Sequence, residues 1–128
     1  MSDRLPNKVA VVTGGASGIG EGIVRRFCGE GAKVILADLD EVNGARIAAE
    51  CGADFAQLDV SSAESWQLLA NKLRDERGQL DIMVNNAGVV TGLDITAVTV
   101  DAWQQLMSIN LLGMMLGCQT AISLMRDN

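Results

Sequence analysis

The chain has 128 residues, the usual size of a single domain, and its 10 basic and 16 acidic side chains give a net charge of −6. Its 48% hydrophobic and 20% charged residues are typical of a globular protein and exclude disorder as the main state. A negative chain without a basic run lacks the positive surface that nucleic acids and anionic lipids bind. We therefore expect no nucleic acid and no membrane among its partners.

The sequence also predicts no membrane-spanning or targeting segment. The longest uninterrupted apolar stretch is 111–118, which is shorter than the roughly 18 residues that a membrane span needs. Residues 1–7 lack the apolar centre of a signal peptide. A cytoplasmic location is the resulting expectation.

Residue types that are rare or missing restrict the chemistry. The three cysteines are odd in number and far apart in sequence, so they predict neither a disulfide framework nor a zinc site but small buried hydrophobes: Cys28, Cys51 and Cys118. The chain contains no His and no Tyr. Nucleophilic devices that depend on His are therefore excluded, and no metal site is predicted.

Short apolar runs alternate with segments of helical periodicity. The runs are rich in β-branched residues and predict buried strands at 8–13, 33–37, 55–58 and 80–84. Helices are predicted at 18–30, at 41–51, from the capping-box motif Ser61-x-x-Glu64 to Gly78, and from Thr99 or Asp101 onward. The alternation predicts an α/β fold with a Rossmann-type, doubly wound parallel sheet in one domain, residues 1–128.

The long last helix is expected to turn one apolar stripe toward the core. That stripe comprises Trp103, Met107, Leu111, Met114, Cys118, Ile122 and Met125. Asn110 lies on the same stripe, where an amide needs hydrogen-bond partners because an unsatisfied buried one costs roughly 1–3 kcal/mol. Asn110 therefore either has a structural role or holds a water molecule in a site.

A glycine-rich motif, Thr13-Gly14-Gly15-Ala16-Ser17-Gly18-Ile19-Gly20, joins the first predicted strand to the first predicted helix. Glycines at this place let the backbone turn sharply and approach a pyrophosphate, which the free N–H groups at the helix start attract. A tight turn without a ligand is the alternative. The motif predicts a dinucleotide site if acidic residues follow at the later strand ends.

Acidic residues do follow the second and third predicted strands. Asp38 can accept hydrogen bonds from both hydroxyls of an adenine ribose, and its charge disfavours a 2′-phosphate. The alternative is that Asp38 only caps a loop, with Asp40 equally well placed. Asp59 can accept from an adenine amino group while Val60 packs on the ring, or Asp59 is an ordinary strand-to-helix cap.

Asn85-Asn86-Ala87-Gly88 follows the fourth predicted strand, where a ligand that crosses the carboxyl ends of the strands must pass. The two amides either contact that ligand or brace neighbouring strands. Gly88 allows close approach of a ligand to the backbone.

In this order and spacing, the motifs resemble the short-chain dehydrogenase/reductase family over the whole chain. The resemblance implies a Rossmann fold that binds NAD or NADP, and Asp38 favours NAD. It implies a cofactor site composed of Gly14, Ser17, Gly18, Ile19, Gly20, Asp38, Leu39, Asp59, Val60, Asn86, Ala87 and Gly88.

The resemblance also implies a catalytic role for Asn110, which matches the family's Asn that positions a water molecule in a proton relay. The family's Ser and Tyr-x-x-x-Lys are missing, and the only lysines are Lys8, Lys33 and Lys72. The sequence ends where a fifth strand is due, so we expect an amino-terminal half with marginal stability or a tendency to associate. For the complete protein the resemblance implies a homo-oligomer.

These features favour an NAD-dependent oxidoreductase that moves hydride between NAD(H) and an alcohol or ketone, with this chain binding the cofactor but not turning over. Since Tyr is absent, the alternative is a non-catalytic NAD-binding or interaction module. Methyltransferases that use S-adenosylmethionine also place glycines after strand one and acids after strands two and three. The long glycine motif and Asn85-Asn86-Ala87-Gly88 favour the dehydrogenase.

Overall fold

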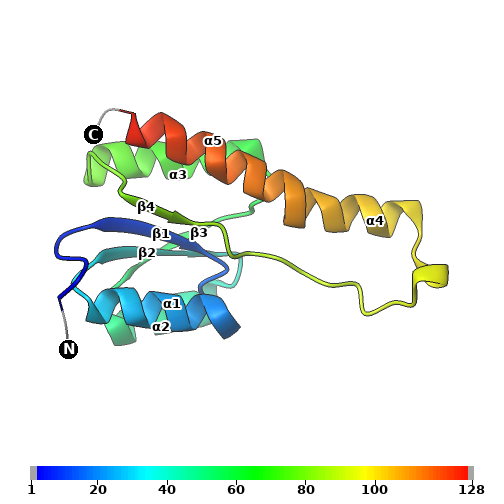
Figure 1. Ribbon diagram of the computed structural model, residues 1–128, viewed down its shortest axis with the longest axis horizontal. Helices are drawn as coiled ribbons and strands as arrows, with labels where there is room; N and C mark the ends of the chain where they lie inside the picture. Colours follow the sequence, from blue (N-terminus) through cyan, green and yellow to red (C-terminus); the bar gives the residue numbers. More distant parts are fainter. Residues whose placement is uncertain (1–2, 127–128) are drawn as a thin grey trace.

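A sheet of four parallel strands, in the order β3-β2-β1-β4, forms the centre of the computed structural model, which describes residues 3–126 (Figure 1). The strands are β1 (Val9–Thr13), β2 (Lys33–Asp38), β3 (Asp54–Gln57) and β4 (Ile82–Val84). The helices are α1 (Gly18–Gly29), α2 (Glu41–Cys51), α3 (Ala63–Glu76), the 3₁₀ turn η1 (Ile95–Ala97), α4 (Val100–Met107), the π-helical turn η2 (Ser108–Leu112) and α5 (Gly113–Met125). This is the α/β Rossmann-type architecture that the sequence predicts.

Helices cover both faces of the sheet, with α1 and α2 on one side and α3 and α5 on the other (Figure 1). Because successive side chains of a strand point to opposite faces, each buried strand contributes to two cores. Val11 packs on the α3 and α5 side, whereas Val12 and Leu36 pack on the α1 and α2 side. All five residues of β1 are buried, which explains its continuous apolar sequence.

The order of the strands determines where a ligand can bind. β1 lies between β2 and β4. The chain adds β2 and then β3 on one side of β1, and it then crosses back to add β4 on the other side. At such a reversal the helices on the two faces leave a crevice beyond the carboxyl ends of the strands. The glycine-rich turn after β1 and the chain after β4 meet at this crevice.

Two helix starts differ from or refine the sequence prediction. The capping residue of α3 is Ser62 and not Ser61: the Ser62 hydroxyl accepts a hydrogen bond from the backbone N–H of Ser65 at 3.1 Å. Ser61 is already engaged, because both its N–H and its hydroxyl donate to Asp59. Thr99 caps α4 by accepting from the N–H of Ala102 at 3.1 Å.

Most of the predicted apolar stripe of the long helix is wrong, although Met125 does pack against the core. Trp103, Leu111 and Ile122 are 54%, 63% and 54% exposed, and Met114 and Cys118 are exposed as well. The residues of α5 that face α3 and the sheet are Gly113, Gly117, Ala121 and Leu124. The helix is apolar on more than one side, so periodicity does not identify the packed face, and the small side chains let α5 approach the sheet closely.

The helical segment Val100–Met125 is long and apolar enough to cross a membrane by length and composition alone: it has 26 residues and a mean hydropathy of 1.3 in its best 18-residue window. Uninterrupted apolar runs alone did not predict this. Core helices of globular proteins can have the same length and hydropathy. Here one face of α5 packs against α3 and β4, and 17% of the 18-residue window is buried.

The cysteines are more exposed than expected, and two of them are in contact. Cys118 is exposed, and its sulfur accepts a 3.6 Å hydrogen bond from the side-chain amide of Asn85. Cys28 and Cys51 are half-buried and in contact, because the crossover through β2 places the carboxyl ends of α1 and α2 side by side. Within residues 3–126, no group of three or more His, Cys, Asp or Glu could hold a metal ion.

Asp81 links the start of β4 to the start of β1 and gives the fold an acid-sensitive contact. Its carboxylate accepts from the N–H of Val9 at 2.8 Å and from Gln79 at 2.7 Å, and its own N–H donates to the carbonyl of Val9. The hydrogen bond from Val9 holds the pKa of Asp81 below its usual range. A lowered carboxyl pKa stabilises the fold above the ordinary value near 3.9, and this contribution is lost as pH falls through the lowered value.

We expect Asp81→Asn to have a lower urea midpoint than the wild type at pH 7, and the two midpoints to converge as pH falls from about 5 to about 2. Equilibrium urea unfolding followed by circular dichroism across this range measures the difference. Asp75→Asn, which alters an exposed carboxylate on α3, serves as the control and should follow the wild type. A constant gap between Asp81→Asn and wild type at every pH would contradict the account.

Candidate functional site

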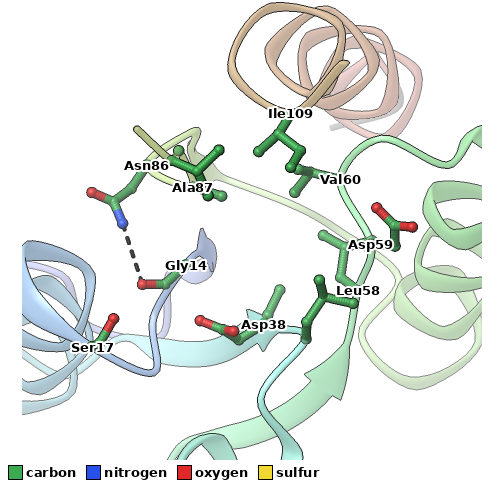
Figure 2. Close-up of a pocket in the computed structure, with 13 residues that line it drawn as sticks. Gly14, Ser17, Asp38, Leu58, Asp59, Val60, Asn86, Ala87 and Ile109 are labelled. Carbon is green, nitrogen blue, oxygen red and sulfur yellow. Dashed lines mark hydrogen bonds between the residues drawn. The ribbon is translucent and has the colours of Figure 1, made fainter. Parts of the chain in front are cut away.

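A cavity of about 380 Å³ lies beyond the carboxyl ends of the strands (Figure 2). Its walls come from the turn after β1, the ends of β2 and β3, the chain after β4 and the π-helical turn η2. The lining residues are Gly14, Ser17, Ala37, Asp38, Leu39, Leu58, Asp59, Val60, Asn86, Ala87, Gly88, Val89 and Ile109. The cavity occupies the crevice in which ligands of open α/β sheets bind.

The glycine-rich turn forms one wall and leads directly into α1. Gly14 has φ +67°, a conformation that L side chains rarely adopt, and a Cβ on it would lie 2.9 Å from the Cα of Ala87. A Cβ on Gly20 would overlap the carbonyl oxygen of Gly14. Ser17 precedes α1 but makes no side-chain capping hydrogen bond, so its hydroxyl does not satisfy the first N–H groups of the helix.

Thr13 and Asn86 hold this turn against the chain after β4. The Thr13 hydroxyl is buried, donates to the carbonyl of Val84 at 3.3 Å and accepts from the N–H groups of Asn86 and Ala87, both at 3.0 Å. In return, the side-chain amide of Asn86 donates to the carbonyls of Thr13 at 3.0 Å and Gly14 at 3.3 Å (Figure 2). Asn86 therefore braces the two strand ends and lines the cavity at the same time.

The carboxylate of Asp38 lies at the end of β2 and lines the cavity beside the glycine-rich turn (Figure 2). One of its oxygens accepts from the N–H of Ala16 and the other from the N–H of Asp40, each at 3.0 Å. Asp40 is instead the capping residue of α2, where it accepts from the N–H of Asn43, and it does not line the cavity. The structure thus separates the two acids that the sequence leaves equivalent.

Asp59 and Val60 form the wall beyond β3. One carboxylate oxygen of Asp59 accepts from the hydroxyl and N–H of Ser61, at 2.6 and 3.0 Å, which fixes the turn before α3. The carbonyl of Val60 accepts from the indole N–H of Trp66 at 2.9 Å, and the side chain of Val60 lies beside that of Ile109 on the cavity wall (Figure 2). Asp59 therefore fixes the turn before α3 without capping the helix, a role that Ser62 has, and it also lines the cavity.

Asn110 ties the π-helical turn to the chain after β4. Its side-chain oxygen accepts from the N–H of Val89 at 2.8 Å, and its side-chain nitrogen donates to the carbonyl of Val89 at 2.7 Å. A Cβ on Gly88 would lie 3.3 Å from the same oxygen of Asn110. Asn110 itself does not line the cavity, whereas its neighbour Ile109 does.

The cavity brings together nine of the residues that the resemblance implies for the cofactor site: Gly14, Ser17, Asp38, Leu39, Asp59, Val60, Asn86, Ala87 and Gly88. Gly18, Ile19 and Gly20 form the first turn of α1 beside it without lining it, and Ile19 is 78% exposed. Sequence reasoning missed the apolar lining residues Ala37, Leu58, Val89 and Ile109. Ala37 and Leu58 directly precede the two acids and were open to detection, but Ile109 reaches the cavity only because of η2.

The lysines lie away from the cavity. Lys8 directly precedes β1 and Lys33 begins β2, so both lie at the amino ends of the strands, whereas the cavity lies at the carboxyl ends. Lys72 on α3 donates to the carbonyl of Phe55 at 3.5 Å. Together with the lack of His and Tyr, this leaves the cavity with carboxylates and amides but no basic side chain among its lining residues.

Comparison with known proteins identifies relatives of this chain. A family model described as short chain dehydrogenase matches residues 8–128. A 3-beta-hydroxysteroid dehydrogenase of Comamonas testosteroni is 40% identical over 129 aligned positions, which cover 99% of this chain and 51% of the relative. A 3-alpha-(or 20-beta)-hydroxysteroid dehydrogenase of Mycobacterium bovis is 36% identical, with 99% and 50% covered.

A third relative, an NADP-dependent (R)-specific alcohol dehydrogenase of Lentilactobacillus kefiri, is 36% identical, and the match covers 99% of this chain and 52% of that enzyme. The chain spans about half the length of the curated relatives it matches.

Proposed function

Since the chain belongs to the short-chain dehydrogenase family, we propose that its cavity binds NAD and that the complete protein is an NAD-dependent oxidoreductase of alcohols and ketones. The observation that carries this proposal is the carboxylate of Asp38, which lines the cavity beside the glycine-rich turn and accepts a hydrogen bond from the N–H of Ala16 in that turn. When bound, NAD⁺ accepts a hydride from an alcohol carbon and NADH returns it to a carbonyl.

The residues of the cavity fit such a cofactor. The absence of side chains at Gly14 and Gly20 lets a pyrophosphate approach the backbone, and the first turn of α1, which has no side-chain cap, offers N–H groups and a positive helix end. Asp38 offers carboxylate oxygens to ribose hydroxyls, and Asp59 with Val60 offers an acceptor and an apolar surface to adenine. Asn86, Ala87 and Gly88 line the path toward Asn110, where the nicotinamide end belongs in this proposal.

Asp38 also supports NAD over NADP. A 2′-phosphate about 4 Å from its carboxylate would meet a repulsion of about 4 kcal/mol at an effective dielectric constant near 20. For one unit of charge on the phosphate, this repulsion corresponds to a preference of about a thousandfold. One relative is named as NADP-dependent, so the choice of cofactor depends on this chain's own acid and not on family membership.

Calorimetric titration of Asp38→Asn with NAD⁺ and NADP⁺ tests the proposal. We expect the wild type to bind NAD⁺ more tightly, and the substitution to reduce the ratio of the two affinities by about tenfold or more. Asp40→Asn is the matched control, because Asn caps a helix as well as Asp does and Asp40 lies outside the cavity. An unchanged ratio in Asp38→Asn, or no binding of either nucleotide by wild type, would contradict the proposal.

For the reaction itself, this chain contributes Asn110, whose side chain fixes the backbone of Val89 beside the cavity. By resemblance to the family, that amide positions a water molecule for proton transfer. The chain has no Tyr and no lysine at the cavity, so we infer that it binds cofactor without turning over. The same lack favours, as the second candidate, a non-catalytic NAD-binding module.

Homo-oligomerisation also belongs to this proposal. The outward side of α4 and α5 exposes large apolar side chains, Trp103, Leu111 and Ile122 among them. Large apolar side chains that are exposed together on one helical segment are typical of protein interfaces. It supports association of the protein with a second copy of itself, as the family resemblance implies.

A further inference from the structure

The carboxyl ends of α1 and α2 bring two thiols into contact on the face of the sheet opposite α3 and α5 (Figure 1). The Sγ atoms of Cys28 and Cys51 are 3.7 Å apart, although 22 residues separate them in the chain. The thiol of Cys28 donates toward the sulfur of Cys51, whose own thiol donates to the carbonyl of Ile47 at 3.1 Å. Both residues are half-buried at the edge of the core on this face of the sheet.

Ion pairs beside the two sulfurs hold the helices in this arrangement. Arg25 of α1 bonds Glu50 of α2 at 2.6 Å and Glu21 of its own helix at 2.9 Å. Arg46 bonds the other oxygen of Glu50 at 2.9 Å. Arg25 lies one helical turn before Cys28, and Glu50 directly precedes Cys51, so the pairing of α1 with α2 occurs at the thiols themselves.

We propose that Cys28 and Cys51 are a disulfide-forming pair, an oxidation site that covalently joins α1 to α2. The sulfurs need to approach by roughly 1.7 Å to reach disulfide bonding distance, a movement within the range of side-chain rotation. This proposal does not rest on NAD binding, because the pair lies at the ends of α1 and α2 that are remote from the cavity.

The oxidant is a peroxide, which the reaction consumes. The sulfur of Cys51 attacks one oxygen of hydrogen peroxide; the O–O bond breaks, one water molecule leaves and Cys51 becomes a sulfenic acid. The sulfur of Cys28 then attacks that sulfur, the S–O bond breaks, and a second water molecule leaves as the S–S bond forms. Two thiol protons and two electrons pass to the peroxide, which is reduced to two water molecules.

The order of attack follows from the surroundings of the two thiols. Burial, together with the hydrogen bond to Cys51, raises the pKa of the Cys28 thiol to about 12, so Cys28 stays protonated near neutral pH. The hydrogen bond from Cys28 stabilises a thiolate at Cys51, so Cys51 is the sulfur that meets the peroxide and Cys28 is the one that resolves the sulfenic acid.

The test uses the Cys118→Ser variant, in which Cys28 and Cys51 are the only thiols, and treats the folded chain with hydrogen peroxide. We expect both thiols to disappear from a thiol titration and the mass to fall by two hydrogen atoms, without a covalent dimer. The linked chain should unfold at a higher urea concentration, and dithiothreitol should reverse this, because the crosslink restricts the unfolded chain. In wild type, peptide mapping should find Cys28 linked to Cys51.

The matched control is Cys28→Ser in the same background, which leaves Cys51 without a resolving thiol. Peroxide should then add oxygen to Cys51 and produce no internal crosslink. Circular dichroism before oxidation confirms that each variant is folded. The proposal is overturned if peroxide leaves both thiols free or adds oxygen to both, or if the crosslink forms only in urea.

Discussion

Replacing Thr13 by valine is expected to lower the free energy of unfolding by about 2–4 kcal/mol, because two N–H groups then lose their acceptor. The Thr13 hydroxyl accepts from the N–H groups of Asn86 and Ala87 and donates to the carbonyl of Val84. Valine fills almost the same volume, so the substitution tests these hydrogen bonds and not packing. Equilibrium urea unfolding measures the loss.

Thr13→Ser is the matched variant, since it keeps the hydroxyl and removes only a methyl group. It should cost about 1 kcal/mol, the usual effect of one buried methyl. NAD⁺ titration of both variants adds a functional readout, because Asn86 and Ala87 line the cavity. If Thr13→Ser destabilised the chain as much as Thr13→Val, packing and not hydrogen bonding would explain the role of this side chain.

The second large effect is expected for Gly20→Ala. A Cβ at Gly20 would overlap the carbonyl oxygen of Gly14 and press on the side-chain nitrogen of Asn86. The start of α1 must then move away from the glycine-rich turn, at a cost of about 1–3 kcal/mol in stability. Because that movement displaces the proposed pyrophosphate site, we expect NAD⁺ affinity to fall by about tenfold or more. Urea unfolding and calorimetry measure the two effects.

Gly22→Ala is the control for this substitution. Gly22 lies in the same helix, but a Cβ there meets open space. Alanine is a better helix former than glycine, so the variant should gain about 0.5–1 kcal/mol in stability and bind NAD⁺ as wild type does. Equal loss of binding in both variants would contradict a specific role for the close contact between Gly20 and Gly14.

Much of the fold is predictable from the sequence because its signals are local. The β-branched run before Thr13 can only be a buried strand, and Gly52 and Gly78, both with positive φ, end α2 and α3 where the sequence places those ends. The cavity was also accessible to prediction, since carboxyl ends of parallel strands lie at one edge of a sheet. Nine of the thirteen lining residues are among those that the family resemblance implies.

The missed features depend on contacts between segments that are distant in sequence. Trp103 and Leu111 look like core residues, yet the packed face of the long helix consists of small residues that fit against Val60 and Asn85. The π-helical turn places Ile109 at the cavity, and no periodicity rule anticipates it. Asp38 and Asp40 were equivalent until their hydrogen bonds separated them.

The most direct test of the central claim is to titrate the ¹⁵N-labelled chain with NAD⁺ and record the shifts of its backbone amide signals. The account predicts saturable shifts at the start of α1, at Asp38, at Asp59 and Val60, and from Asn86 to Gly88. The signals of the α3 and α5 surface, Gln67 and Gln119 among them, should not move. No saturable shifts, or shifts confined to the α3 and α5 surface, would contradict a dinucleotide site at the carboxyl ends of the strands.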